Sequence, residues 1–164
     1  MDLKIKNKLA LVTGGANGIG EEISLELAKA GVDLLVTSRT KSPILNLKKK
    51  LKKFKVEIKG IEVDFLKKGW EKSFFNKIKS YNIDILVNNA GHNLNITDPY
   101  CSKKDWNKVL DLNFFAPVQI CNNLIPGMKK NGWGRIVNIT SCAGLENMGP
   151  ITYGIAKSSL TTYT

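Results

Sequence analysis

Short apolar runs alternate with longer mixed stretches along the chain. The apolar runs have the length and composition of buried parallel strands and lie at residues 9–12, 32–37, 56–63, 83–87 and 135–140. The stretches between them predict helices at residues 19–30, 43–54, 70–80, 102–130 and from 152 onward. This alternation predicts an α/β fold, a doubly wound parallel sheet in three α/β/α layers, formed by a single domain over residues 1–164. We expect Pro117 and Pro126 to kink or divide the long helix at 102–130.

Glycines and polar residues follow the ends of the predicted strands. These residues are the glycine motif that begins at Thr13, then Arg39, Asp64, Asn89 and Ser141. Ligands of open parallel sheets bind beyond the carboxyl ends of the strands. The common placement of these residues therefore predicts one binding site at that edge of the sheet.

The first motif is T-G-G-A-N-G-I-G at residues 13–20. Glycines here let the backbone turn sharply and approach a pyrophosphate, while the following helix presents free N–H groups and the positive end of its dipole. The spacing G-x-x-x-G-x-G differs from the general G-x-G-x-x-G fingerprint. A turn that only permits tight packing of strand against helix is the alternative, but the position after the first strand favours a dinucleotide cofactor.

Ser38 and Arg39 end the second predicted strand, where NAD-binding enzymes usually carry an acid for the ribose hydroxyls. No acid stands between residues 37 and 40. The Arg39 guanidinium is suited to a 2′-phosphate through charge-assisted hydrogen bonds. We therefore predict NADP(H) as the cofactor and keep NAD(H) as the alternative, while an exposed arginine in a basic chain is the non-binding interpretation.

Tyr153 and Lys157 lie four residues apart, so they share one face of the last predicted helix. A free tyrosine has a pKa near ~10, and a neighbouring ammonium lowers that value by stabilising the phenolate. Ser141 follows a strand twelve residues earlier, where its hydroxyl can hydrogen-bond a substrate oxygen as negative charge develops. The alternatives are a surface tyrosine beside a surface lysine, and a serine that satisfies a turn.

The chain has a formal net charge of +11, concentrated in lysines at 48–55 and 67–79. Such a charge is compatible with a nucleic-acid partner. Nucleic-acid surfaces usually rely on arginine for bidentate contacts, however, and the chain has only Arg39 and Arg135. Solvated, lysine-rich helix faces are the favoured interpretation, and we expect no nucleic-acid partner.

Three cysteines without C-x-x-C spacing, together with the single histidine His92, argue against a disulfide framework and against a metal site. No apolar run reaches the ~18 residues of a transmembrane helix. Residues 1–8 are polar and lack the apolar region of a signal peptide. We therefore expect no metal, no membrane association and a cytoplasmic location.

Taken in order, the glycine motif, N-N-A-G at 88–91, Ser141 and Y-x-x-x-K at 153–157 resemble the short-chain dehydrogenase/reductase family over nearly the whole chain. The resemblance implies a Rossmann-like, NAD(P)-binding domain. It implies a catalytic group formed by Asn113, Ser141, Tyr153 and Lys157. The cofactor contacts that it implies are Thr13, Gly14, Asn17, Gly18, Ile19, Gly20, Ser38, Arg39, Asp64, Phe65, Asn89, Ala90, Gly91, Tyr153 and Lys157.

The same resemblance assigns roles to the catalytic group. Tyr153 is the general acid or base, Lys157 lowers the pKa of Tyr153 and binds the nicotinamide ribose, and Ser141 orients the substrate oxygen. Asn113 matches a helix asparagine that holds a proton-relay water. The implied reaction is hydride transfer between NADP(H) and a small carbonyl or alcohol substrate, such as a 3-oxoacyl thioester, a sugar or a steroid-like ketone.

Members of the family continue well past the position of Thr164. The resemblance therefore implies a domain that lacks its last strands and leaves an open sheet edge. It also implies homodimers or homotetramers for a full-length chain, paired through the helix around 110–124 and the helix after Tyr153. Two other interpretations stay open at this point: a catalytically inactive, cofactor-binding fragment, and a basic nucleic-acid-binding module.

Overall fold

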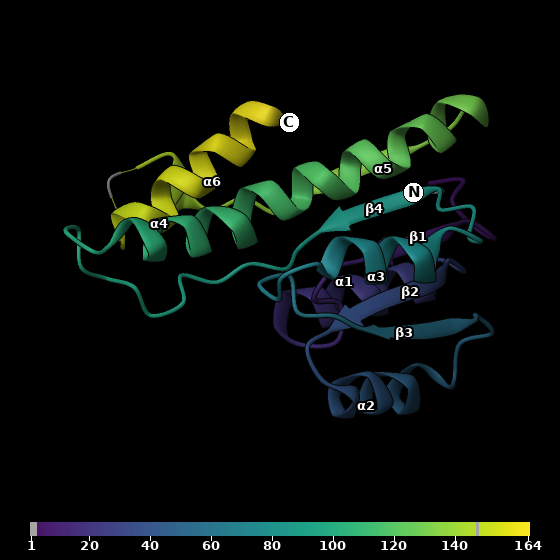
Figure 1. Cartoon of the computed structure of the whole chain (residues 1–164). Coiled ribbons are helices and arrows are strands. Elements are labelled where there is room, and N and C mark those ends of the chain that lie inside the picture. The colour runs from purple at the N-terminus through teal and green to yellow at the C-terminus, as the bar shows by residue number, and fades with distance from the viewer. Residues whose placement is uncertain (1–2, 147) are drawn as a thin grey trace.

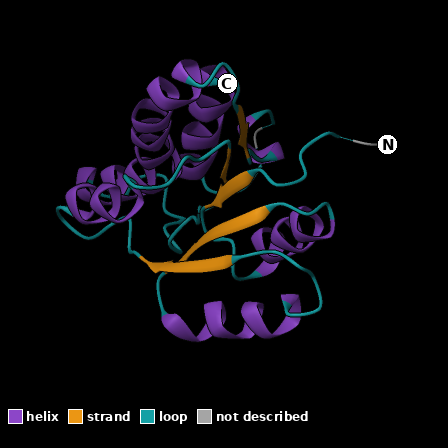
Figure 2. Cartoon of the chain, turned by 90° about the vertical axis from the view of Figure 1, so that its right-hand side faces the viewer, coloured by secondary structure: helices purple, strands orange, loops and turns teal. Residues whose placement is uncertain are grey.

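A computed structural model of the chain describes residues 3–146 and 148–164 and has a single parallel sheet at its centre. The strands are β1 (Leu9–Val12), β2 (Asp33–Ser38), β3 (Ile58–Glu62), β4 (Ile85–Asn88) and β5 (Arg135–Asn138). They pair in the order β3-β2-β1-β4-β5, and every neighbouring pair is parallel. Figure 2 shows this sheet between helices on both sides. The predicted doubly wound, three-layer α/β/α fold is therefore confirmed.

The helices fill the connections between strands (Figure 1). They are α1 (Gly18–Lys29), α2 (Lys41–Leu51), α3 (Trp70–Ile78), α4 (Lys103–Leu110), the π-helical segment η1 (Asp111–Phe115), α5 (Ala116–Lys130), the 3₁₀ turn η2 (Cys142–Gly144) and α6 (Ile151–Tyr163). Element boundaries lie within three residues of those predicted from the sequence. In the described part of the chain no helix is long and apolar enough to cross a membrane.

Alternate residues of each central strand pack into two separate cores. On β1, Leu11 packs with the cluster of α3 and α5, whereas Ala10 and Val12 pack with that of α1 and α2. The same alternation recurs on β4, where Leu86 joins the first cluster and its two neighbours join the second. Side chains on a strand point to opposite faces in turn, so a strand buried on both faces is apolar throughout. This explains why the strands are continuous apolar runs in the sequence.

The long predicted helix is interrupted, although not where its prolines alone would place the break. The interruption is η1, which ends two residues before Pro117, while Pro126 lies inside α5 and the helix continues through it to Lys130. Proline has no backbone N–H, so Pro117 withholds the regular helical donor from the carbonyl of Asn113, four residues earlier. A π-helical segment often accompanies such a gap, and it is often functional. Of the expected kink or division at Pro126, the division does not occur.

Candidate functional site

A cavity of about 510 Å³ opens at the carboxyl ends of the strands. The strand order reverses direction between β1 and β4, and the loops after these two strands diverge there to form its floor. The predicted residues that line it are Gly14, Asn17, Ile19, Ser38, Arg39, Asp64, Phe65, Asn89, Ala90, Gly91, Ser141, Tyr153 and Lys157. Four predicted residues do not line it: Thr13, Gly18, Gly20 and Asn113. The single site predicted from the strand ends is thus formed by residues far apart in the sequence.

The loop between β1 and α1 is held close to the loop after β4. The Thr13 hydroxyl accepts hydrogen bonds from the backbone N–H of Asn89 at 2.9 Å and of Ala90 at 3.0 Å. The Asn89 side chain donates in return to the carbonyl oxygens of Thr13 at 3.0 Å and Gly14 at 3.2 Å. Thr13 therefore positions two walls of the cavity from behind, although it does not line the cavity itself.

The glycines of this loop meet two different needs. Gly14 has φ +62 and Gly18 has φ +52, conformations that side chains rarely adopt. A Cβ on Gly20 would lie 2.3 Å from the Gly14 carbonyl oxygen, so only glycine permits this close approach. The residue before α1, Asn17, makes no capping hydrogen bond with its side chain. The N–H groups of the first helical turn, which have no partner within the helix, are therefore available to an anion beside the cavity.

The other end of the cavity carries a cation. Arg39 is exposed just beyond β2, and among the described residues no carboxylate lies within ion-pair distance of it. Ser38 and Asp64 line the same end, and one Asp64 carboxylate oxygen accepts the Leu66 N–H at 3.0 Å. Helix α2 begins two residues after Arg39, again without a side-chain cap from Thr40. The arrangement suits a phosphate group.

Tyr153 and Lys157 stand on successive turns of α6, and Ser141 faces them from the start of η2. Burial raises the pKa of Tyr153 above its ordinary value, and the Ser141 hydroxyl lowers it by a smaller amount. The role expected of Lys157, lowering the pKa of Tyr153, stays a prediction. The Lys157 nitrogen lies 5.7 Å from the centroid of the tyrosine ring and donates instead to the Ile139 carbonyl oxygen at 2.8 Å.

Lys157 is almost completely buried, with 2% of its surface exposed. Burial disfavours the charged ammonium and lowers its pKa to about 8. The segment η2 packs closely on α6 beside Lys157. A Cβ on Gly144 would lie only 2.8 Å from the Lys157 backbone carbon, so this position requires glycine. Gly154 is equally constrained, because its Cβ would lie 2.7 Å from the Ala143 carbonyl oxygen. These two glycines permit the close packing of η2 against α6.

Asn113 is buried behind the cavity, and its side chain holds the backbone of the loop after β4 in place. The side-chain amide N–H groups of Asn113 donate to the backbone carbonyl oxygens of His92 at 2.9 Å and Val109 at 2.8 Å. The side-chain oxygen Oδ1 of Asn113 accepts the backbone N–H of His92 at 3.1 Å. A Cβ on Gly91 would lie 2.7 Å from this same oxygen and 3.1 Å from the Lys157 nitrogen. The asparagine thus clamps the loop after β4 against the lysine.

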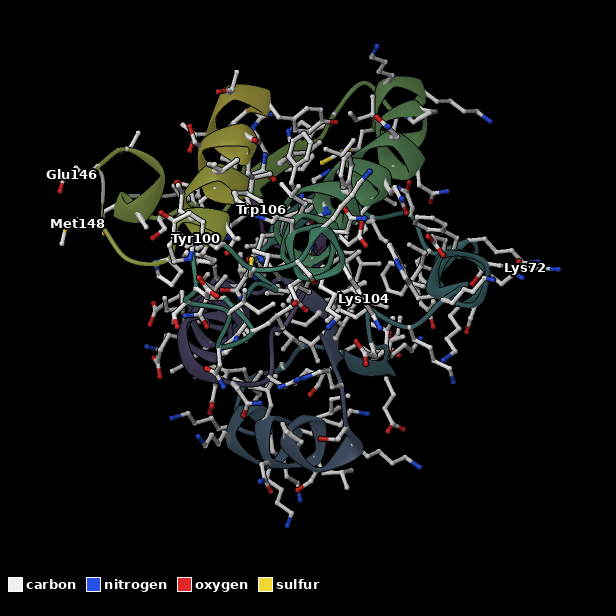
Figure 3. The ribbon with its side chains drawn as sticks, turned by 60° about the vertical axis from the view of Figure 1, so that its left-hand side comes forward. Lys72, Tyr100, Lys104, Trp106, Glu146 and Met148 are labelled. Carbon is white, nitrogen blue, oxygen red and sulfur yellow. The ribbon has the colours of Figure 1, made fainter. Side chains whose placement is uncertain are left out.

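Several lining residues were not predicted from the sequence: Thr37, Val63, Leu66, Leu112, Ile139 and Thr140. Most of them are sequence neighbours of a predicted residue at a strand end, and this placement is the feature of the sequence that could have identified them. Thr37 also has a definite contact, since its hydroxyl accepts the Gly14 N–H at 3.0 Å. Leu112 comes from η1 and carries no such local signal. Figure 3 shows Glu146 and Met148 pointing outward from the loop before α6, away from this cavity.

Comparison with known proteins places this geometry in a family. The family model described as short chain dehydrogenase matches residues 8–164. A 3-oxoacyl-[acyl-carrier-protein] reductase FabG of Buchnera aphidicola is 37% identical, over 96% of this chain and 65% of the relative. An acetoacetyl-CoA reductase of Cupriavidus necator is 33% identical, over 96% and 65%. The chain therefore spans about two thirds of the length of these curated relatives.

Among solved structures, an L-sorbose reductase of Gluconobacter frateurii, complexed with NADPH and L-sorbose, superposes with a TM-score of 0.92. It is 28% identical, and the match covers 99% of this chain and 64% of that one. An actinorhodin polyketide ketoreductase with NADPH gives a TM-score of 0.85 at 28% identity, covering 96% and 62%. Together with the family match, the strand order and the residues around the cavity, these findings show that the chain belongs to the short-chain dehydrogenase/reductase family.

Proposed function

We propose that this chain binds NADP(H) and catalyses hydride transfer between its nicotinamide and a carbonyl or alcohol carbon. The observation that carries the proposal is that Ser141, Tyr153 and the buried Lys157 line one cavity, whose far end holds Arg39. A proton donor and a phosphate-binding cation are the two things that a reductase using NADPH needs. One cavity contains both.

The fit of a dinucleotide rests on the glycine loop and on Arg39. The close approach of Gly20 to Gly14 leaves backbone N–H groups beside the cavity for a pyrophosphate. Arg39, without a carboxylate partner among the described residues, would neutralise the 2′-phosphate that distinguishes NADP(H) from NAD(H). Asp64, Phe65 and the loop after β4 would surround the adenosine half. The solved L-sorbose reductase, which contains NADPH, supports this assignment.

The bound cofactor supplies the hydride, and the chain supplies the proton. Because burial raises the pKa of Tyr153, its hydroxyl is protonated at neutral pH and is ready to donate to the substrate oxygen as the carbonyl is reduced. Ser141 offers a second hydroxyl to the same oxygen, where negative charge develops in the transition state. In the oxidation direction the same tyrosine would accept the alcohol proton.

Lys157 and Asn113 would support the tyrosine from behind. The charged lysine nitrogen uses one N–H on Ile139 and keeps two for the cavity, where a nicotinamide-side ribose would lie. Its charge favours the tyrosinate that forms when the proton leaves. For Asn113 we propose the role that the family resemblance implies, holding a proton-relay water, and we assign that water to the Asn113 backbone carbonyl. Support comes from Pro117, which withholds the regular helical donor from that carbonyl.

The substrate that we propose is a 3-oxoacyl thioester, with a sugar or steroid-type ketone as the alternative. Both relatives described above are reductases of 3-oxo thioesters by name, whereas the solved neighbour is complexed with a sugar. We also propose a cytoplasmic homo-oligomer paired along α5 and α6. Phe115, Ile155 and Tyr163 are exposed apolar side chains on η1 and α6, as a helix-to-helix interface requires.

NADPH fluorescence titration, followed by NADPH oxidation in the presence of acetoacetyl-CoA, L-sorbose and a steroid ketone, tests the proposal. We expect micromolar or tighter binding, turnover of at least one substrate, and loss of turnover in Tyr153→Phe with cofactor binding retained. Binding without turnover of any substrate would leave a catalytically inactive, cofactor-binding chain. No binding, together with DNA binding that weakens steeply with salt, would favour the nucleic-acid module instead.

A further inference from the structure

His92, the single histidine of the chain, lines the cavity but has no part in the roles assigned above. Its backbone is fixed from both sides, because its N–H and its carbonyl oxygen both bond to the Asn113 side chain, at 3.1 Å and 2.9 Å. The Cα of this residue therefore has a defined position next to Gly91. Gly91 in turn contacts the Lys157 nitrogen closely enough that an added Cβ would lie 3.1 Å from it.

The imidazole ring is oriented by the turn that follows it. The Nδ1 atom accepts the Leu94 N–H at 2.8 Å. Leu94 makes this bond with φ 58, a left-handed conformation that is unfavourable for a leucine. Because Nδ1 accepts a hydrogen bond, the proton of the neutral ring lies on Nε2. The ring thus presents a directed N–H donor that has no partner among the described residues of the chain.

The cavity that this donor lines is the one with the glycine loop and Arg39. The loop before α6, where a substrate would enter, lines a separate hollow formed by residues such as Leu145, Met148 and Ile151. His92 does not contribute to that hollow. Since it follows Gly91, which touches Lys157, it lies at the end of the cavity assigned to the nicotinamide half of the cofactor.

We propose that the Nε2–H of His92 donates a hydrogen bond to an oxygen of the nicotinamide-side ribose or its phosphate in NADP(H). This inference rests on the proposed function, because it assumes the same cofactor in the same cavity. The donor of this contact is held in place before binding. It therefore contributes to affinity for the nicotinamide half and leaves recognition of the adenosine half to Arg39.

The test compares two probes on the full chain: NADPH, and 2′,5′-ADP, which carries the 2′-phosphate but lacks the nicotinamide half. We expect His92→Phe, which keeps a flat ring without the N–H, to raise the NADPH dissociation constant about fivefold, the effect of one ordinary hydrogen bond. Binding of 2′,5′-ADP should stay unchanged. His92→Gln retains a donor of similar reach and should bind NADPH within about twofold of the unmodified chain. Arg39→Ala is the matched control, because it should weaken both probes.

Three outcomes would overturn the inference while the proposed function stands. They are unchanged NADPH binding in His92→Phe, an equal loss for both probes in that variant, and a loss in His92→Gln as large as in the phenylalanine variant. Failure of the unmodified chain to bind NADPH at all would instead overturn the proposed function, and this inference with it. The exposed ring and the purely backbone contacts with Asn113 make both variants compatible with folding, which a melting curve checks.

Discussion

Replacing the buried Lys157 by methionine should stabilise the protein at neutral pH while removing its activity. The lysine is 2% exposed, and burial lowers its pKa from the ordinary 10.5 to about 8. In the unfolded chain the ammonium is fully hydrated, so folding at pH 7 carries the cost of burying a charge. Methionine has a similar length and no charge, so it fills the same space without that cost.

The difference between the two pKa values fixes the size of the effect. One pKa unit corresponds to about 1.36 kcal/mol, so the buried charge costs roughly 3 kcal/mol below pH 8. The variant also leaves the Ile139 carbonyl oxygen without its donor, which costs about 1 kcal/mol. A net gain of about 2 kcal/mol in the free energy of unfolding is therefore expected at pH 7.

The pH dependence of stability independently predicts the sign of the stability difference between the variant and the unmodified protein. Between pH 8 and 10.5 the unfolded chain binds more protons at this lysine than the folded chain does, so the stability of the unmodified protein rises with pH in that window. Below pH 8 Lys157 is protonated in both the folded and the unfolded chain, so the full cost of burying its charge remains. The stability gain of the variant should therefore be largest at pH 7 and close to zero near pH 10.

Urea unfolding of both proteins at pH 7 and pH 10, at constant ionic strength, measures these two differences. Lys68→Met is the matched control, because Lys68 is exposed and its replacement should change stability by less than about 0.5 kcal/mol at either pH. A Lys157→Met variant that is less stable than the unmodified protein at pH 7, or whose gain does not shrink at pH 10, would refute the reasoning from burial.

Three further predictions follow from the site. Arg39→Asp should shift preference from NADPH toward NADH, because the 2′-phosphate meets an acid in place of a cation; unchanged ratios of kcat/KM for the two cofactors would contradict the assignment. Gly20→Ala should destabilise the chain by about 1–3 kcal/mol and weaken NADPH binding, since its Cβ would lie 2.3 Å from the Gly14 carbonyl oxygen. The matched change Gly127→Ala, on an exposed turn of α5 where a Cβ meets nothing within 4 Å, should stabilise it by about 0.5–1 kcal/mol in the same urea titration. For ketone reduction, kcat/KM should fall as the pH rises through about 8, because Lys157 loses the charge that supports Tyr153; a profile flat to pH 9.5 would argue against this role.

The sequence predicts the scaffold and much of the site because the signals for them are local. Apolar runs mark strands that are buried on both faces, and the residues after them lie at one edge of the sheet, which brings Arg39, Ser141 and Tyr153 to one cavity. The proline-based prediction was partly right, since Pro117 does adjoin an interruption, but the break takes the form of η1 and Pro126 causes none.

Other features depend on contacts between distant segments. Asn113 clamps His92 across 21 residues, and Lys157 bonds to Ile139 on another element. The direction of the Tyr153 pKa shift could not be read from the spacing of Tyr153 to Lys157, because it depends on burial by the surrounding fold, which raises the pKa. Helical spacing shows only that two residues share a face. It does not give the distance between their charged atoms or the amount of water around them.

The central claim is that this cavity carries a hydride from NADPH to a carbonyl carbon under proton donation by Tyr153. The most direct measurement is mass spectrometry of the alcohol formed from the accepted ketone with NADPH that carries deuterium in the transferred position at nicotinamide C4. We predict one deuterium on the carbinol carbon of the product, and loss of product formation by at least ~100-fold in Tyr153→Phe. Alcohol without deuterium, or equal product from the phenylalanine variant, would contradict the claim.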